Sequence, residues 1–333
     1  MSVSIKDVAQ LAKVSTSTVS HVINKTRNVN PETEAKVLVA IEKLHYELNP
    51  IASSLRSGNS KLIGFVVAHL SNFYLDIGLT MEDELRKDGY QLVYLNSKED
   101  KEREKENIKN LVMRNIAGLI VAPVDSDCSY MNQIVGDKCP IVFFDRKPFG
   151  IDRDCVLSTN FQGAFEGTSL LLDRGYTKLG FIGSHFDVTM NERFEGFRSA
   201  IIQRNIPFQE ELAKFGSSHN KTFKLLKYGE GFDFAKDFIE NKKVEAIFCG
   251  NDITTIGVLT YLKENNLSVP EDVDVICFDD TVWLQLAYKS ISAIDQDGTG
   301  IANAVVSTFL SRINKTDTGS YSEKRIDTKL IPR

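Results

Sequence analysis

Short apolar runs alternate with charged amphipathic segments from residue 61 to near the end of this 333-residue chain. The runs are rich in Val, Ile and Phe and occupy residues 62–68, 91–95, 118–122, 141–144, 179–182, 246–249 and 273–278. Fully apolar strands separated by helices are typical of parallel sheets that are covered on both faces. About 270 residues of this pattern predict an α/β fold of two doubly wound parallel lobes, with a cleft at the carboxyl ends of the strands.

The first 47 residues have a helical pattern instead. Apolar residues recur at the spacing of one helix face from Ile5 to Ala12. Ser15 can cap a second helix, and Asn30, which a proline follows, can begin a third. We expect the three helices to share one core in a small domain over residues 1–47.

A further helical signal follows this domain. Asn49 and Pro50 begin a segment of about eight residues that Gly58 closes. A helix this short does not stay folded alone in water, so it should become ordered only against another surface. We therefore predict a hinge helix and linker over residues 48–60, followed by a body over residues 61–333.

Charge is distributed unevenly along the chain. The net charge is −5, yet residues 1–61 carry eight Lys and Arg against five Asp and Glu. The remaining residues are strongly acidic in balance. A basic head on an acidic body suggests that only the head approaches a polyanion such as DNA.

The outer face of the second helix is unusual for a solvated helix. Residues 15–21 read Ser-Thr-Ser-Thr-Val-Ser-His, so hydroxyls and one imidazole stand where Glu and Lys would be expected. Short side chains let a helix enter the major groove closely, and hydroxyls and His bind both phosphates and base edges. The alternative is a capped helix with a structural role only, and the basic surplus favours a helix-turn-helix.

Polar residues follow several predicted strands of the body. Asp145 and Arg146 end one strand, Asn251 and Asp279 end two others, and Gln296 follows a fourth. The carboxyl ends of parallel strands meet at one edge of a sheet, where ligands bind. Carboxylates accept hydrogen bonds from sugar hydroxyls, and Arg and Asn donate them, so this set favours a small polyol. Any one of these residues could instead be a cap or a surface ion pair.

Three further features of the body concern packing and exposure. Trp283 could line the cleft or could pack in the core, and the charge run at residues 99–106 is expected to be a solvated helix face. The five cysteines are scattered without a Cys-x-x-Cys pair, which predicts reduced and mostly buried thiols.

Catalytic, metal and targeting signals are lacking in the sequence. It contains no Gly-Lys-Ser/Thr phosphate loop, no His-Glu-x-x-His, no Gly-x-Ser-x-Gly and no spaced set of metal ligands. We therefore expect no enzyme, no cofactor and no metal, with a sugar-binding or sugar-metabolising α/β enzyme as the alternative. No signal peptide and no apolar run near about 20 residues occurs, so we expect a cytoplasmic protein without a membrane partner.

Several segments resemble the LacI-type bacterial repressors. In the head these are residues 5–9, 14–24 and 40–46, and the His21 variant is most similar to the purine- and ribose-repressor branch. In the body they are residues 71–74, 145–146, 193–197, 250–252, 269–273, 278–280 and 294–296. The resemblance covers nearly the whole chain, although Lys13 stands where the family usually has Gly.

The resemblance implies how the head and hinge bind a double-stranded DNA operator. The second helix would lie in the major groove, and the hinge helices of two subunits would pair in the minor groove. The implied DNA-binding residues are Thr16, Ser17 and His21 at bases, Ser15, Ser20, Asn24, Thr33 and Tyr46 at the backbone, and Ala52 and Leu55 in the hinge. Leu55 would be the apolar wedge between base steps.

The resemblance also implies a homodimer on a pseudo-palindromic operator, with a periplasmic-binding-protein-like body that binds a small-molecule effector. The implied effector residues, similar to those of ribose-binding proteins, are Phe73, Tyr74, Asp145, Arg146, Arg193, Asn251, Asp279 and Gln296. The implied lobes are residues 61–158 with 292–320, and residues 159–291 with 321–333. We therefore predict a repressor of a carbohydrate-use operon that a pentose or hexose controls.

Overall fold

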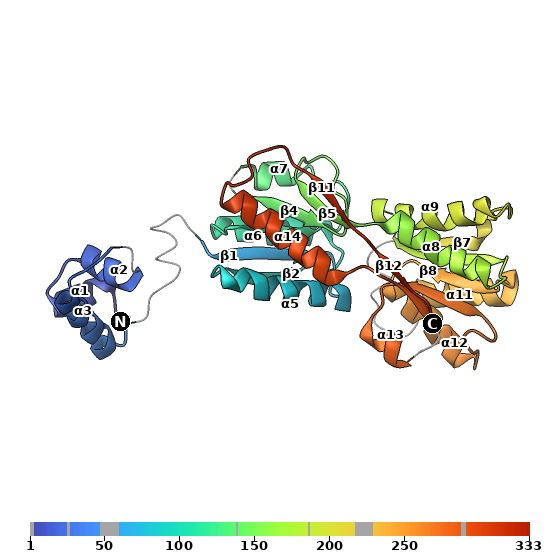
Figure 1. Cartoon of the computed structure of the whole chain (residues 1–333), viewed down its shortest axis with the longest axis horizontal. Helices are drawn as coiled ribbons and strands as arrows, with labels where there is room; N and C mark the ends of the chain where they lie inside the picture. Colours follow the sequence, from blue (N-terminus) through green and yellow to red (C-terminus); the bar gives the residue numbers. More distant parts are fainter. Residues whose placement is uncertain are drawn as a thin grey trace. The chain divides into compact units, whose positions relative to one another are not determined.

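The computed structural model describes residues 3–24, 27–46, 60–137, 139–185, 187–216, 229–287 and 291–333. The chain divides into two compact units, Met1–Ser60 and Lys61–Arg333 (Figure 1). The predicted hinge helix, with Ala52 and Leu55, lies outside the described residues. No helix among the residues described is long and apolar enough to cross a membrane.

The first unit is a three-helix domain. Its helices are α1 (Ile5–Ala12), α2 (Thr16–Asn24) and α3 (Pro31–Leu44). One small core holds them together, formed by Val8, Ala9, Ala12, Val19, Val22, Val37 and Ala40. The helix starts follow local chemistry, because Asn30 accepts a hydrogen bond of 2.9 Å from the Glu32 amide and Pro31 occupies the first position of α3.

The first lobe of the second unit is a six-stranded parallel sheet in the order β11-β5-β4-β3-β1-β2. Its strands are β1 (Leu62–Val67), β2 (Gln91–Asn96), β3 (Gly118–Ala122), β4 (Ile141–Phe144), β5 (Asp154–Ser158) and β11 (Glu323–Ile326). Its helices are α5 (Asn72–Lys87), α6 (Lys101–Met113), α7 (Met131–Ile134) and α14 (Gly298–Ile313). Helices α5 and α14 cover one face and α6 and α7 the other, which explains why the strands are apolar throughout (Figure 1).

The second lobe has the order β12-β10-β9-β8-β6-β7, with β12 antiparallel at the edge. Its strands are β6 (Leu179–His185), β7 (Ala213–Gly216), β8 (Ala246–Cys249), β9 (Asp274–Phe278), β10 (Ser292–Asp295) and β12 (Lys329–Ile331). Its α-helices are α8 (Asn160–Asp173), α9 (Val188–Gln203), α11 (Glu230–Lys236), α12 (Asp252–Glu264) and α13 (Val282–Ala287), and it also has the 3-10 helix η1 (Glu210–Leu212) and the π-helix η2 (Asp237–Lys242). Helices α8 and α9 cover one face, and α11 and α12 the other. The predicted fold class is confirmed.

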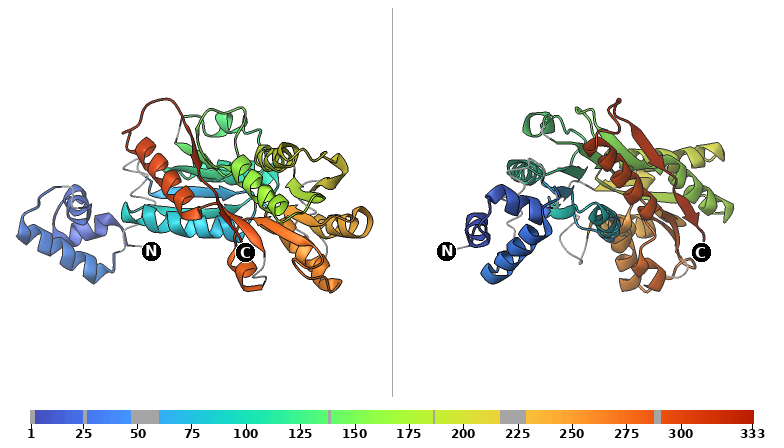
Figure 2. Two further views of the ribbon diagram at one scale, coloured as in Figure 1. Left: turned by 45° about the vertical axis from the view of Figure 1, so that its right-hand side comes forward. Right: turned by 60° about the vertical axis from the view of Figure 1, so that its left-hand side comes forward.

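The chain passes between the lobes three times, after β5, β10 and β11. The C-terminal segment, red in the ribbon views, makes the last of these passages (Figures 1 and 2). The limits expected from the sequence are wrong at two strands, because residues 292–295 belong to the second sheet and residues 323–326 to the first. Sheet membership depends on pairing partners: β10 pairs with β9, and β11 pairs with β5.

Buried thiols and tryptophan packing complete the core. Four of the five free cysteines are buried and Cys139 is half-buried, as predicted. Trp283 packs against the core on the α11 and α12 side of the second sheet. The core alternative is therefore confirmed for Trp283.

Candidate DNA-binding face and ligand cavity

Helix α2 presents its hydroxyl-rich face outward while Val19 and Val22 enter the core. Ser15 caps the helix, because its Oγ accepts a hydrogen bond of 3.1 Å from the Thr18 amide. The same Oγ lies 2.7 Å from the Ser17 hydroxyl. The cap thus fixes the first turn of the face and leaves both hydroxyl groups exposed.

The other predicted DNA-binding residues of the head occupy three elements. Thr16 and Ser17 are exposed in the first turn of α2, Ser20 and His21 are half-buried one turn later, and Asn24 ends the helix. Residues three and four apart lie on one side of a helix, so the side chains of Thr16, Ser17, Ser20 and His21 form one continuous face. Thr33 is half-buried in the first turn of α3, and Tyr46 packs against the head core.

The turn between α1 and α2 is strained. Lys13 ends α1 with φ 57° and ψ 42°, which is the left-handed region. This is the conformation that favours the Gly usual in the family, and a side chain there costs about 1–2 kcal/mol. Lys13 and Thr33 line one open groove between α1 and α3 together with Lys36 and Lys43.

All residues predicted to bind the effector line one small cavity of about 50 Å³ between the lobes. Phe73 and Tyr74 begin α5, and Asp145 and Arg146 follow β4 in the first lobe. The second lobe contributes the others, which are Arg193 from α9, Asn251 after β8, Asp279 after β9 and Gln296 after β10. Sequence reasoning missed the remaining lining residues, which are His69, Ser71, Ser184, Asp187, Thr189, Met190 and Asp252.

Arg193 organises the wall of the second lobe and is 4% exposed. Its Nε donates to Asn160 Oδ1 at 2.8 Å, its Nη1 to the Gly250 carbonyl at 2.8 Å and its Nη2 to Gln296 Oε1 at 3.2 Å. The guanidinium also lies 3.7 Å from the centre of the Phe278 ring. Every nitrogen of this buried cation thus has an acceptor, as a desolvated charge requires.

Asp279 and Asn251 extend this network. Gln296 Nε2 donates to Asp279 Oδ1, and the Asp252 amide donates to Asp279 Oδ2 at 3.3 Å. Burial, followed by repulsion from Asp279, raises the pKa of Asp252 to about 7. Asn251 Oδ1 accepts from the Thr254 amide at 2.9 Å, so Asn251 is the cap of α12 as well as a lining residue.

The first lobe provides the aromatic side of the cavity. Tyr74 donates its hydroxyl to Asp145 Oδ2 at 2.6 Å, and the Phe73 and Tyr74 rings lie 5.6 Å apart. Burial raises the pKa of Asp145 against the opposing effect of Arg193 and Arg146. Asp145 has φ 64° and Asp279 has φ 85°, so a left-handed turn holds each facing carboxylate.

Arg146 is bound by the protein on several sides. Its Nη2 and Nη1 lie 2.9 and 3.2 Å from the Glu99 carboxylate, and Nη1 also donates to the Pro123 and Val124 carbonyls at 3.1 Å each. Glu99 is 8% exposed, and its Oε1 lies 2.6 Å from His69 Nδ1. The expectation that residues 99–106 form a solvated face is therefore wrong at Glu99.

The same expectation is wrong at Glu104, which is fully buried in α6. Its Oε1 accepts from the Tyr130 hydroxyl at 2.5 Å and its Oε2 from the Val124 amide at 2.8 Å. Burial raises the pKa of Glu104 to about 7 against these hydrogen bonds. Glu104 faces the segment after β3, whereas its charged neighbours in the sequence face solvent.

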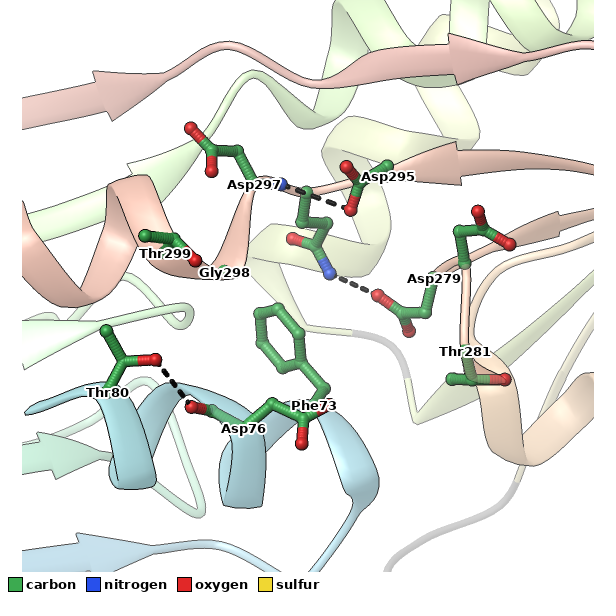
Figure 3. Close-up of a pocket in the computed structure, with 11 residues that line it drawn as sticks. Phe73, Asp76, Thr80, Asp279, Thr281, Asp295, Asp297, Gly298 and Thr299 are labelled. Atoms are coloured by element: carbon green, nitrogen blue, oxygen red, sulfur yellow. Dashed lines mark hydrogen bonds between the residues drawn. The ribbon is translucent and has the colours of Figure 1, made fainter. Parts of the chain in front are cut away.

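A second cavity of about 270 Å³ adjoins the first through Phe73, Asp279 and Gln296 (Figure 3). Its other lining residues are Asp76, Thr80, Asp280, Thr281, Asp295, Asp297, Gly298 and Thr299. Arg333 binds Asp280 at 2.6 and 2.8 Å. Among the residues that the structure describes, neither Lys nor Arg lines this cavity, so its field is negative.

The chain is similar to bacterial regulators along its length. Residues 4–49 match the model "Bacterial regulatory proteins, lacI family", and residues 168–333 match "Periplasmic binding protein-like domain". The HTH-type transcriptional repressor PurR of Aliivibrio fischeri is 32% identical over 94% of this chain and 92% of its own length. The same named repressor of Haemophilus influenzae is 30% identical over 97% of this chain and 95% of its own.

Solved structures agree with this similarity. A putative ribose operon repressor from Burkholderia thailandensis is 25% identical, with a TM-score of 0.73 over 83% of this chain and all of its own. The lac repressor dimer bound to operator and the anti-inducer ONPF has a TM-score of 0.83 over the whole of this chain and 98% of its own, at 21% identity. At that identity the second match supports the fold.

Proposed function

Because the chain belongs to the LacI family of bacterial regulatory proteins, we propose that it represses a carbohydrate-use operon and responds to an uncharged pentose or hexose held between its lobes. Its nearly full-length relatives are transcriptional repressors, and the chain is a DNA-binding repressor with an effector-binding body rather than an enzyme. The observation that carries the finer proposal is that acceptors, donors and aromatic rings converge on one cavity. We also propose that the protein acts in the cytoplasm.

The proposed DNA contact is the α2 face in the major groove. Exposed Thr16 and Ser17 with His21 one turn later match a helix that reads base edges through short side chains. One head reaches one half-site, so a pseudo-palindromic operator needs two copies.

We propose that these two copies form a homodimer through α5 and α13. Leu75 and Leu79 are exposed one turn apart on α5, and Val282 and Leu286 are exposed one turn apart on α13. Both helices flank the second cavity, which Asp76 on α5 and Thr281 before α13 help to line. A second copy would cover these side chains, as expected for an isologous interface.

The chemistry of the cavity favours a sugar over a purine. Asp145 and Asp279 offer carboxylate oxygens from opposite lobes, which suit a ring with hydroxyls on several sides. Among the described lining residues the aromatic rings, Phe73 and Tyr74, come from the first lobe only. A sugar needs apolar cover on one face, whereas a purine has two flat faces and few hydrogen-bond donors.

The charges of the site favour an uncharged sugar over its phosphate. Arg146 and Arg193, the cations of the cavity, already bind protein acceptors. The adjoining cavity carries several aspartates. A phosphate there would meet a negative field without a free cation among the described residues, which opposes its binding.

Thermal-shift measurements with pentoses, hexoses, their phosphates and purines test the effector class. We expect a neutral sugar to raise the melting temperature of the full chain, because a ligand that binds only the folded state stabilises it. Asp279→Asn should abolish this shift, while Asp173→Asn, at an exposed ion pair, should preserve it. A shift with a purine and none with any sugar would contradict the sugar effector and leave the repressor assignment intact.

Fluorescence anisotropy on promoter DNA tests the role of α2. We expect His21→Ala to weaken binding to the cognate operator about tenfold while binding to random DNA changes little, because a base contact specifies sequence and a phosphate contact does not. Gln10→Ala, at an exposed position of α1, is the matched control. Equal losses on cognate and random DNA would remove the base-reading role of His21.

A further inference from the structure

Glu99 occupies a backbone conformation that its side chain does not favour. It has φ 55° and follows Lys98, which has φ 52°, so two left-handed residues turn the chain after β2. The Glu99 amide donates to the Ala68 carbonyl at 2.6 Å, which ties this turn to the end of β1. Non-Gly residues in this region are uncommon and cluster at functional sites.

The buried carboxylate of Glu99 joins three strand ends. Its Oε1 lies 2.6 Å from His69 Nδ1, after β1, and 2.9 Å from Arg146 Nη2, after β4. Its Oε2 accepts from Arg146 Nη1 at 3.2 Å, and that nitrogen also donates to the Pro123 and Val124 carbonyls after β3. Two parallel hydrogen bonds and two carbonyls fix both the position and the plane of the guanidinium.

The fixed guanidinium reaches the second lobe. Arg146 Nε lies 3.7 Å from Asp187 Oδ2. Asp187 caps α9 by accepting from the Met190 amide at 2.8 Å, and α9 carries Arg193. A second contact crosses at the same place, where Thr189 Oγ1 donates to the Asp145 carbonyl at 2.9 Å.

We propose that Glu99 is a positioning residue of the effector site, which orients Arg146 and His69 in the cavity wall so that Arg146 meets Asp187 across the closed cleft. His69, Arg146 and Asp187 line the cavity, whereas Glu99 does not, so Glu99 acts on the ligand through its neighbours. The inference rests on the proposed function in one respect, namely that a ligand occupies this cavity. It adds a row of contacts from His69 through Glu99 and Arg146 to Asp187 that links ligand affinity to closure of the lobes.

A double-mutant cycle on the full chain tests the proposal, with D-ribose as the probe in isothermal titration calorimetry. Glu99→Gln keeps the shape of the side chain and removes its charge, and Asp187→Asn does the same across the cleft. We expect each single variant to bind D-ribose about tenfold more weakly, the scale of one hydrogen bond to a charged group. The double variant should bind no more weakly than the weaker single variant, because both act through Arg146.

Controls separate positioning from a structural role. Glu102→Gln changes a carboxylate that is 79% exposed in the next helix and should leave the affinity unchanged. A defect in folding alone would not couple Glu99 to a residue of the other lobe. Unchanged affinity in Glu99→Gln, or losses that add in the double variant, would overturn the proposal.

The experiment distinguishes failure of the Glu99 proposal from failure of the proposed sugar effector. If D-ribose fails to bind the wild-type chain, the same cycle is measured by urea unfolding without ligand. Non-additive midpoints for Glu99→Gln and Asp187→Asn would still support a link across the lobes, and additive midpoints would overturn it. Failure of the sugar proposal appears separately, as the absence of heat with any neutral sugar.

Discussion

The two units differ in how far their polar contact residues are exposed to solvent. The head carries most of its candidate contact residues on α2, where Thr16 and Ser17 are exposed while Val19, Val22 and Ile23 pack in or against the core. The body gathers its candidate contact residues from the ends of separate strands and from α5 and α9, and it packs them against each other around one cavity. The difference implies that binding and stability are separable in the head and coupled in the cavity.

Individual carboxyl groups of the two units differ in the direction of their pKa shifts. In the head, the hydrogen bond from Ser4 lowers the pKa of Asp7, and the bond from Lys36 lowers the pKa of Glu32. In the body, burial raises the pKa of Glu104 to about 7. Raising the pH through the acidic range therefore favours folding through Asp7 and Glu32 and disfavours it through Glu104. Hydrogen bonds lower the pKa of other carboxyls of the body, such as Asp127 and Asp237, so the unfavourable direction belongs to Glu104 and not to the whole body.

The largest expected effect is that of removing Arg193. Arg193→Ala leaves Asn160 Oδ1 and the Gly250 carbonyl without this donor, and it leaves Gln296 Oε1 with the Ser158 hydroxyl alone. The substitution should cost about 3–5 kcal/mol of unfolding free energy, because buried acceptors lose their partners, and it should also abolish effector binding. Urea unfolding of the full chain, followed by fluorescence, measures the loss. Arg204→Ala, at the C-terminal end of the same helix α9, is the control.

The control removes an exposed ion pair with Asp173 and should cost less than about 1 kcal/mol. Equal and small losses in Arg193→Ala and Arg204→Ala would break the comparison. They would mean that the cavity residues, like those of the α2 face, can change without loss of stability.

The second-largest expected effect is that of Glu104 on the pH dependence of the free energy of unfolding. Below pH about 4.5 the carboxyl is protonated in both states, and between about 4.5 and 7 only the unfolded chain loses the proton, so stability falls as pH rises. The fall amounts to about 3 kcal/mol at most. Glu104→Gln should remove it, as unfolding of the two proteins at a series of pH values would show.

Asp7→Asn should change the pH dependence of stability in the opposite direction to Glu104→Gln. The pKa of Asp7 is lowered in the folded head, so its contribution is present above its unfolded pKa and is lost as the pH falls. The variant should therefore weaken the head at neutral pH and make it less sensitive to acid. If Glu104→Gln left the pH profile of the body unchanged, the contrast between buried Glu104 and exposed Asp7 would not hold.

The sequence predicted what depends on local spacing and on strand ends. The α2 face follows from one helix period, and Asp145, Asn251, Asp279 and their strand-end neighbours follow from the rule that ligands gather at carboxyl ends. The resemblance to the family implied the helical residues Phe73, Tyr74 and Arg193. Glu99 was missed although it follows β2 much as Asp145 follows β4, because it stood in a charge run that reads as solvated. Its burial depends on His69 and Arg146, which are 30 and 47 residues away.

Long-range pairing also explains the misplaced strands. Residues 292–295 read like any short buried strand, and only their register with β9 assigns them to the second sheet. Residues 323–326 are mostly exposed and charged, so their sequence gives no sign of the sheet edge beside β5. Such choices between two similar sheets are made by tertiary contacts, which short-range patterns do not contain.

The smallest expected effect comes from Lys13, a residue of the head whose backbone is left-handed. Lys13→Gly should stabilise the head by about 1 kcal/mol, because it relieves a left-handed residue whose exposed side chain faces an open groove. Lys6→Gly, the same substitution within α1, should destabilise the head by about 1 kcal/mol. Hydrogen exchange of the α1 amides in the full chain measures both changes.

Glu99→Gly extends this test to the body, because Glu99 shares the left-handed conformation of Lys13. There the relief of strain is opposed by the loss of a buried carboxylate bound to His69 and Arg146, so we expect a net loss of stability. Lys13→Asn keeps the tolerated backbone and removes the charge, which separates strain from any electrostatic contribution to DNA binding. If Gly stabilised both positions equally, the contacts of the buried Glu99 carboxylate would contribute nothing to the stability of the body.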